Sequence, residues 1–212
     1  TFYNAKLYYK DAEKIRLQKE GQAIPISAMD KYGKVIEKCQ KVLKEYPESS
    51  YRMDAFLLMA QARYFRGDYS LAIQNLNQIQ IGENSTIFEN ARYWNSLCKW
   101  KKGNSQIAIE QLEDLLFKTK SKEIKSKCHL SLAEINKELK NTEKMIFHLE
   151  SSAKVTRDRT QKSIIYGKLA EIAFNKKNYR SALKGYKNII SNSLSKEKIE
   201  NAHLQILKIM RL

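Results

Sequence analysis

The chain has 212 residues, 42% of them hydrophobic, which fits one or two ordinary domains or one array of repeats with a core. Its mean hydropathy is -0.58, and no apolar run approaches the roughly 18 residues of a membrane-spanning helix, which argues against a transmembrane segment. Lys and Arg outnumber Asp and Glu by 39 to 23, and the net charge of +16 suits nucleic acid, an anionic membrane or acidic protein partners.

The positive charge has two interpretations. Lys, Asn and Ile are all abundant, and the basic residues are spread along the chain apart from one cluster at 118–127. We therefore favour a bias in composition over a selected nucleic-acid surface, and we keep a nucleic-acid partner as the alternative. The chain opens on Thr1 with a helical pattern already under way, so we expect a fragment from which a targeting or lipid-attachment segment has been cut.

The first residues already show a helical pattern. Apolar residues recur at i, i+3, i+4 and i+7 almost throughout the chain, and nothing alternates with period two, so the expected fold class is all-α. The first predicted repeat covers residues 1–47 and ends at Tyr46-Pro47, because the residue before a proline avoids the α region. Ser49 or Ser50 can cap the helix that follows.

The second predicted repeat, 50–82, contains the corner "FRGDYSLAI". There Gly67 lets the first helix end and Asp68 caps the second. The corner returns 36 residues later as "GNSQIAI" and then, at steps of 37, as "KNTEKMI" and "KNYRSAL". The remaining repeats and a terminal helix therefore cover residues 86–119, 121–156, 160–192 and 195–211.

Small residues recur where the two helices of a repeat must cross. A small side chain in the first helix and another at the start of the second let the helices approach closely. A helix pair of about 34–37 residues cannot bury its own face, so it stacks on its neighbours in a solenoid, here expected as a single domain over residues 1–212. These positions, with the corner glycines, form the predicted structural set: Ala60, Gly67, Ala72, Gly103, Ala108, Ala170 and Ala182.

This register resembles the tetratricopeptide repeat (TPR) family. That family has a small residue in helix A (the first helix of each pair), Gly-Asp-Tyr at the corner and Ala three residues later, here Ala60, Gly67-Asp68-Tyr69 and Ala72. The resemblance implies a right-handed α-α superhelix of about five helix pairs plus a terminal helix, with helix A lining the concave face. The sequence departs from the family pattern at Arg63, Asn95-Ser96, Lys99 and Met145.

A narrower resemblance concerns "KVLKEYPESSYRMDAFLLMAQARYFRGDY" at 41–69. Its Tyr-Pro-x-Ser-x-Tyr junction, followed by an Ala-rich helix A, is similar to that of bacterial cell-envelope TPR (lipo)proteins of the outer-membrane assembly and cell-division coordinator type. The resemblance implies a periplasmic or outer-membrane-anchored protein, with the cytoplasm as the alternative.

The sequence offers no motif for catalysis. Cys128 and His129 are adjacent on a helix and point to different faces, which disfavours a catalytic pair or a shared metal. Cys39, Cys98 and Cys128 are too widely spaced for a disulfide framework or a zinc site, and each falls in a helical apolar pattern. Three acidic residues close together on one helix are expected to form a solvated face: Glu110, Glu113 and Asp114. We expect no enzyme, no cofactor and no metal.

Aromatic residues on the predicted helix A faces form the candidate partner site. Tyr64, Tyr93 and Trp100 make a stripe beside Lys101 and Lys127, and aromatic anchors with flanking cations suit a peptide or helix partner. Packing between repeats is an equally good explanation of the stripe. The full candidate set is Gln61, Tyr64, Asn90, Tyr93, Trp100, Lys101 and Lys127.

The expected function is a non-catalytic scaffold that binds a peptide or protein segment in the concave groove, within a multiprotein complex of the bacterial envelope. The alternative is a basic helical-repeat protein that binds single-stranded nucleic acid, with bases stacked on the aromatic stripe and lysines on phosphates. The repeats carry no evident side-chain code of the kind that reads RNA base by base, which disfavours that alternative.

Overall fold

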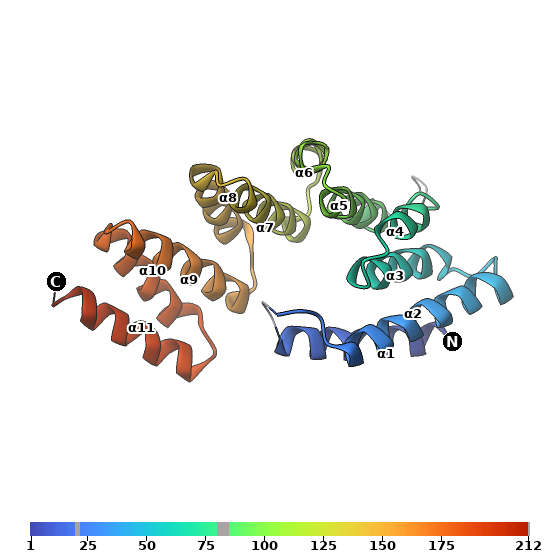
Figure 1. The fold of residues 1–212 in the computed structure, drawn as a ribbon, viewed down its shortest axis with the longest axis horizontal. Coiled ribbons are helices and arrows are strands. Elements are labelled where there is room, and N and C mark those ends of the chain that lie inside the picture. The colour runs from blue at the N-terminus through green and yellow to red at the C-terminus, as the bar shows by residue number, and fades with distance from the viewer. Residues whose placement is uncertain (20–21, 80–84, 212) are drawn as a thin grey trace. The chain divides into compact units, whose positions relative to one another are not determined.

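The structure is a computed structural model that describes residues 1–19, 22–79 and 85–211 (Figure 1). These residues form α-helices joined by short corners, without a strand, so the all-α prediction is confirmed. None of the described helices combines the length and the apolar character needed to cross a membrane. The helices are α1 Phe2–Gln18, α2 Ile26–Glu45, α3 Arg52–Phe65, α4 Tyr69–Leu76, α5 Ser85–Lys101, α6 Ser105–Lys118, α7 Lys122–Glu138, α8 Thr142–Val155, α9 Arg159–Asn175, α10 Tyr179–Asn192 and α11 Lys196–Ile209.

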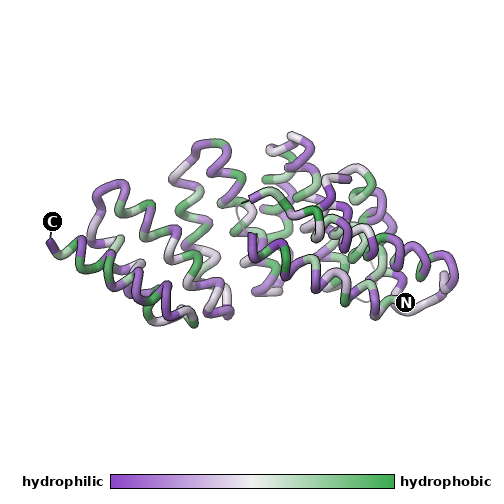
Figure 2. The backbone as a smooth tube through the Cα atoms, turned by 60° about the horizontal axis from the view of Figure 1, so that its bottom comes forward, coloured by the Kyte–Doolittle hydropathy of each residue, from purple (hydrophilic) through white to green (hydrophobic). Residues whose placement is uncertain are grey.

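The chain divides into an N-terminal unit, residues 1–115, and a C-terminal unit, residues 116–212. In the N-terminal unit consecutive helices from α1 to α5 pack on one another, and α3 also contacts α1 and α5; in the C-terminal unit consecutive helices from α7 to α11 pack on one another. Hydrophobic and hydrophilic stretches alternate along the helices, as expected for helices that bury one side (Figure 2). The division into repeats and their union in one solenoid domain over 1–212 stay predictions.

One core cluster of the N-terminal unit, formed by α1, α2 and α3, gathers around Tyr32 on α2. Its ring is fully buried and stacks on Phe65 of α3, with centroids 5.1 Å apart. Its hydroxyl donates a hydrogen bond to Glu13 of α1, and Arg16 pairs with the same carboxylate at 2.7 Å. The Arg16 guanidinium also lies 4.5 Å from the centroid of Phe65. One buried aromatic residue therefore ties the first three helices together.

The corners inside the second to fifth repeats, which join α3 to α4, α5 to α6, α7 to α8 and α9 to α10, share one backbone geometry. Gly67 and Gly103 have φ of 83° and 89°, and Lys140 and Lys177 take the same place in the later repeats with φ of 58°. At each corner the amide of the next residue donates to the carbonyl five residues back, as Asp68 does to Arg63 at 2.9 Å, which is the Schellman end of a helix. The corner therefore needs this geometry but not a glycine.

Asp68 is the N-cap residue of α4 as predicted, but it does not cap the helix through its side chain, and the predicted cap of α3 at Ser49 or Ser50 was wrong. The Asp68 side chain makes no capping hydrogen bond on α4, and its carboxylate lies 3.8 Å from Nε of Arg66 instead. The N-cap residue of α3 is Tyr51, without a side-chain cap, and the Ser49 hydroxyl accepts the amide of Tyr51 before the helix begins. Arg66 competes with the helix end for the Asp68 carboxylate, and the turn before α3 uses the Ser49 hydroxyl. Asn178, in contrast, accepts the Ser181 amide at 3.1 Å.

Helices α9 and α10 pack closely at Gly185. A Cβ atom there would lie 2.7 Å from Cβ and 3.1 Å from Cα of Ala170, and 3.1 Å from the carbonyl oxygen of Tyr166. Real Cβ atoms essentially never approach another atom so closely. This crossing therefore requires glycine on one helix and a small residue on the other, and it forms one wall of a groove described below.

Candidate partner-binding surfaces

The predicted structural residues lie inside the repeats. The five alanines are each at most 1% exposed, and the two glycines occupy left-handed corners. Met145, which replaces the small residue in the fourth repeat, is half-buried against the Ala133 and Leu149 cluster. The buried alanines are Ala60, Ala72, Ala108, Ala170 and Ala182.

Tyr64, in the predicted aromatic stripe, lies within an aromatic cluster of the N-terminal unit. Its ring contacts Phe65, Tyr69 and Trp94 at centroid distances of 5.3, 5.5 and 5.2 Å. Burial raises the pKa of the Tyr64 hydroxyl well above its ordinary value. Tyr64 therefore joins α3, α4 and α5 by packing. Trp94 was missed in the sequence, although its spacing from the buried Cys98 marks the inner face of α5.

Tyr93 and Trp100 lie two turns apart on one side of α5, and both are half-buried. The Lys101 ammonium lies 3.6 Å from the centroid of Trp100, a cation–π contact, and Tyr93 meets Trp94 edge to face. Asn90, one turn before Tyr93, donates to the carbonyl of Thr86 at 2.9 Å. This side of α5 therefore combines partly exposed rings, an amide and a cation.

The remaining two candidates are separate from that row. Gln61 is half-buried on α3, one turn from Tyr64. Lys127 belongs to α7 in the C-terminal unit, where it pairs with Glu123 at 2.5 Å. The structure thus brings α3 and α5 candidates together in one unit and places Lys127 in the other.

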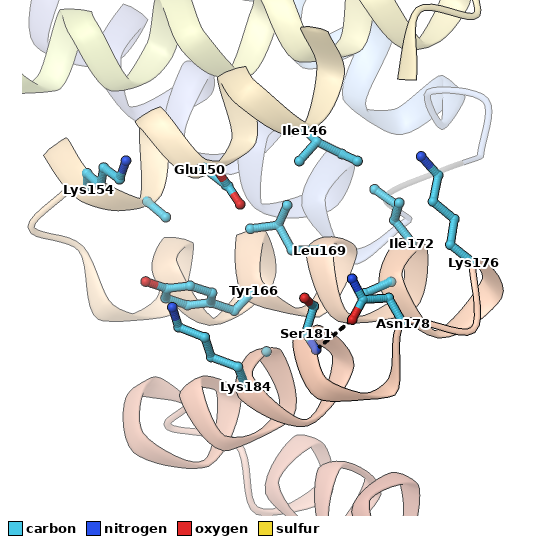
Figure 3. A pocket seen from close by; sticks show the side chains of 13 residues that line it. Ile146, Glu150, Lys154, Tyr166, Leu169, Ile172, Lys176, Asn178, Ser181 and Lys184 are labelled. Atoms are coloured by element: carbon cyan, nitrogen blue, oxygen red, sulfur yellow. Dashed lines mark hydrogen bonds between the residues drawn. The ribbon is translucent and has the colours of Figure 1, made fainter. Parts of the chain in front are cut away.

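A groove of about 510 Å³ lies between α8, α9 and α10 in the C-terminal unit (Figure 3). Its floor is apolar and half-buried: Ile146 from α8, and Tyr166, Leu169 and Ile172 from α9. Its rim carries three exposed lysines, and the Glu150 carboxylate points into the space. We call it the lysine-rimmed groove; its lysines are Lys154 on α8, Lys176 at the end of α9 and Lys184 on α10.

A second groove, of about 400 Å³, lies between α4, α5 and α6 in the N-terminal unit. It occupies the same place in the repeat, two repeats earlier, and its lining combines apolar residues such as Leu76 and Ile79 with a larger number of polar ones. Asn95 donates to the Asn77 side chain at 3.3 Å, and Ser96 to Gln111 at 3.3 Å. Its Arg92 pairs with Asp114 at 2.5 Å, so Asp114 is not simply a solvated residue of the predicted acidic face.

Two histidines meet between α7 and α8. Nδ1 of His129 lies 3.1 Å from Nδ1 of His148, and His148 is buried. Burial, with the neighbouring His129, lowers the pKa of His148 to about 4, so the imidazole is neutral at pH 7. Across the described ranges, no group of three or more His, Cys, Asp or Glu residues is arranged to hold a metal ion.

The three cysteines are buried as predicted, and burial raises the pKa of Cys39 and Cys98 to about 12, which disfavours a reactive thiolate.

Comparison with protein-family profiles and with curated proteins found no match. Among solved structures, the chain is similar to a thermophilic TPR protein of Thermus thermophilus, TTC0263, with a TM-score of 0.55 and 14% identity over 98% of this chain and 100% of that one. It is also similar to MamA, with a TM-score of 0.50 and 16% identity over 81% of this chain and 91% of that one. Similarity at these identities concerns the fold alone, and it agrees with the repeat register: the chain is an all-α, TPR-like solenoid.

Proposed function

We propose that the chain is a non-catalytic protein-interaction scaffold whose helix A faces bind a peptide or protein segment. The observation that carries the proposal is the row of partly exposed rings on α5, where Trp100 is flanked by Lys101 and lies two turns from Tyr93. Half-exposed Trp and Tyr side chains are the residues on which binding energy concentrates in protein interfaces. The TPR-like fold supports a scaffold, since stacked helix pairs expose extended binding faces.

The packing contacts divide the predicted stripe into two kinds of residue. Tyr64 is held by three neighbouring rings, so its ring is needed for the fold. Trp100 lies near the end of α5, stays half-exposed and carries a cation on its face. The proposal therefore assigns partner contact to Trp100, Tyr93, Lys101 and Asn90 on α5, and to Gln61 on α3.

A displayed random-peptide library, selected on the purified chain, tests the proposal. Trp100→Ala should weaken the selected peptides about thirtyfold, the roughly 2 kcal/mol of an interface hot spot, and leave the melting temperature nearly unchanged. Phe117→Ala is the matched control, because Phe117 is 89% exposed on α6 and outside this face. Equal losses in both variants, or a collapse of the fold in Trp100→Ala, would count against an interface at α5.

A nucleic-acid partner is the second candidate, and the distribution of charge is what favours it. Residues 116–212 contain 22 Lys and Arg against 9 Asp and Glu, a net charge of +13, whereas residues 1–115 contain 17 against 14, a net charge of +3. Titration with a fluorescent oligothymidylate at several salt concentrations decides between the two. Binding that falls steeply with salt for any sequence would support nucleic acid over protein.

We further propose an envelope complex as the setting, on the sequence resemblance of residues 41–69 alone. Fractionation of cells that express the full-length gene product is the direct measurement. Recovery with the outer membrane or periplasm would support this setting, and recovery in the cytosol would contradict it without touching the scaffold proposal.

A further inference from the structure

We propose that the lysine-rimmed groove is a second docking site, specific for an acidic peptide segment that also carries apolar side chains. The site lies on the side of α9 that faces α8, in the C-terminal unit, and shares no residue with the α5 surface. It therefore adds a binding site to the proposed scaffold rather than restating the first one.

The floor provides the apolar part of the site. Tyr166, Leu169 and Ile172 lie at successive turns on one side of α9, and Ile146 of α8 faces them across the gap (Figure 3). All four remain half-exposed, although residues of this kind are usually buried in a helical repeat. Covering them with leucine-like side chains of a partner would remove apolar surface from water, which is favourable by about 25 cal/mol per Å².

The rim provides the charge. The three ammonium groups of Lys154, Lys176 and Lys184 come from three different chain segments, and none of them pairs with a carboxylate within the part of the chain that the structure describes. Other surface lysines of the same unit do find partners, such as Lys168 with Glu134 at 2.7 Å. Three unpaired cations around an apolar floor are complementary to carboxylates spaced along an amphipathic segment.

In the equivalent groove of the N-terminal unit, polar side chains stand at several of the positions that are apolar in the lysine-rimmed groove. The positions of Tyr166, Leu169 and Gly185 are occupied two repeats earlier by Arg92, Asn95 and Gln111. Those polar side chains make hydrogen bonds or an ion pair with neighbours in their own unit, so they already have partners. In the C-terminal unit the corresponding residues are apolar or lack a side chain, so the floor is left for a partner.

The chemistry favours a peptide over nucleic acid at this place. A phosphate backbone gains nothing from contact with the apolar side chains of Ile146, Leu169 and Ile172. The Glu150 carboxylate, which points into the groove, would repel the phosphates (Figure 3). A peptide can place carboxylates on the rim lysines and a backbone amide or a cation on Glu150. The groove is open rather than enclosed, since its rim lysines are exposed, which suits a chain segment better than a small ligand.

Fluorescence anisotropy with a labelled amphipathic peptide, Leu on one face and Glu on the other, tests the site. Two further peptides, with Gln for every Glu and Ser for every Leu, and an oligothymidylate serve as comparison probes. We expect the Leu/Glu peptide to bind saturably and both altered peptides to bind about tenfold more weakly or not at all. Equal binding of the Ser peptide, or displacement of the Leu/Glu peptide by the oligonucleotide, would overturn the proposal in favour of a general polyanion surface.

Matched variants locate the site. Lys184→Gln should weaken the Leu/Glu peptide about two- to fivefold, as expected for one exposed charge pair, whereas Lys187→Gln, on the same helix but outside the groove, should not. Leu169→Asn, which installs the residue of the equivalent groove, should weaken it about tenfold. Equal losses for the two lysines would refute the site even if Leu169→Asn failed to fold. Trp100→Ala should leave the affinity for the Leu/Glu peptide unchanged. The proposals for the α5 surface and for the lysine-rimmed groove are therefore tested separately.

Discussion

Gly185 allows a sharp test of how α9 and α10 pack. Replacing this glycine by alanine has two opposed effects. Alanine is the better helix former by about 1 kcal/mol, because glycine loses more backbone freedom on folding. The added methyl would, however, stand 2.7 Å from Cβ of Ala170 and 3.1 Å from two backbone atoms. Carbon atoms prefer about 3.5–4.0 Å, so the helices must move apart.

The loss of stability depends on whether the neighbouring atoms can move away from the added methyl group. Ala170 has no rotamer to change, and Tyr166 meets the methyl through its carbonyl oxygen, so relief requires a shift of a whole helix. Overpacking of this kind costs about 1–3 kcal/mol, which exceeds the gain in helix propensity. We expect Gly185→Ala to destabilise the C-terminal unit by about 1–2 kcal/mol.

Gly167→Ala on α9 is the matched control. Its methyl would meet only Cδ1 of Ile189, at 3.8 Å, an ordinary contact, so the propensity gain should remain and stabilise the protein by about 0.5–1 kcal/mol. Urea unfolding followed by circular dichroism measures both variants, and hydrogen exchange of α9 and α10 localises the change, since repeat arrays need not unfold in one step. If Gly185→Ala were as stable as Gly167→Ala, the close crossing would be wrong.

Two further predictions concern backbone strain and protonation. Lys177→Gly should stabilise the C-terminal unit by about 0.5–1 kcal/mol in urea unfolding, because Lys177 has φ of 58°; Lys187→Gly, inside α10, should destabilise it by about 1 kcal/mol. The lowered pKa of His148 means that the unfolded chain binds the proton more readily, so stability should fall by up to about 2 kcal/mol as pH drops from 6.5 towards 4. His148→Gln should remove this part of the pH dependence, and an unchanged pH profile in that variant would contradict the assignment.

The repeat register was predictable because it rests on backbone requirements. A helix must end in a left-handed residue and restart, and two helices must cross on small side chains, so corners and alanines recur at a fixed step. That step placed corners at 140–146 and 177–183, where the structure has the left-handed Lys140 and Lys177 although neither is a glycine. Periodicity also distinguishes a buried face from an exposed one, which is why Cys39, Cys98 and Cys128 were expected in the core.

Contacts between side chains of different helices were not predictable in the same way. The sequence argued against a Cys128–His129 pair, but it did not indicate that His129 meets His148 on the next helix. It placed Tyr64 in a stripe without showing that Trp94 packs against it. Such contacts depend on the rotation of each helix about its axis, and a small error in rotation exchanges one neighbour for another.

The two grooves suggest where specificity resides in this chain. Ala170 and its counterpart Ser96 are both small and buried, and the close approach of Gly185 leaves no room for a larger side chain at Ala170. One residue earlier, at Leu169 and Asn95, the side chain reaches the groove and no crossing depends on its size. In an array where each repeat contacts mainly its neighbours, such positions can change without disturbing distant repeats. The same repeat position can therefore line one groove with an apolar side chain and the equivalent groove with a polar side chain that bonds to its own unit, within the same fold.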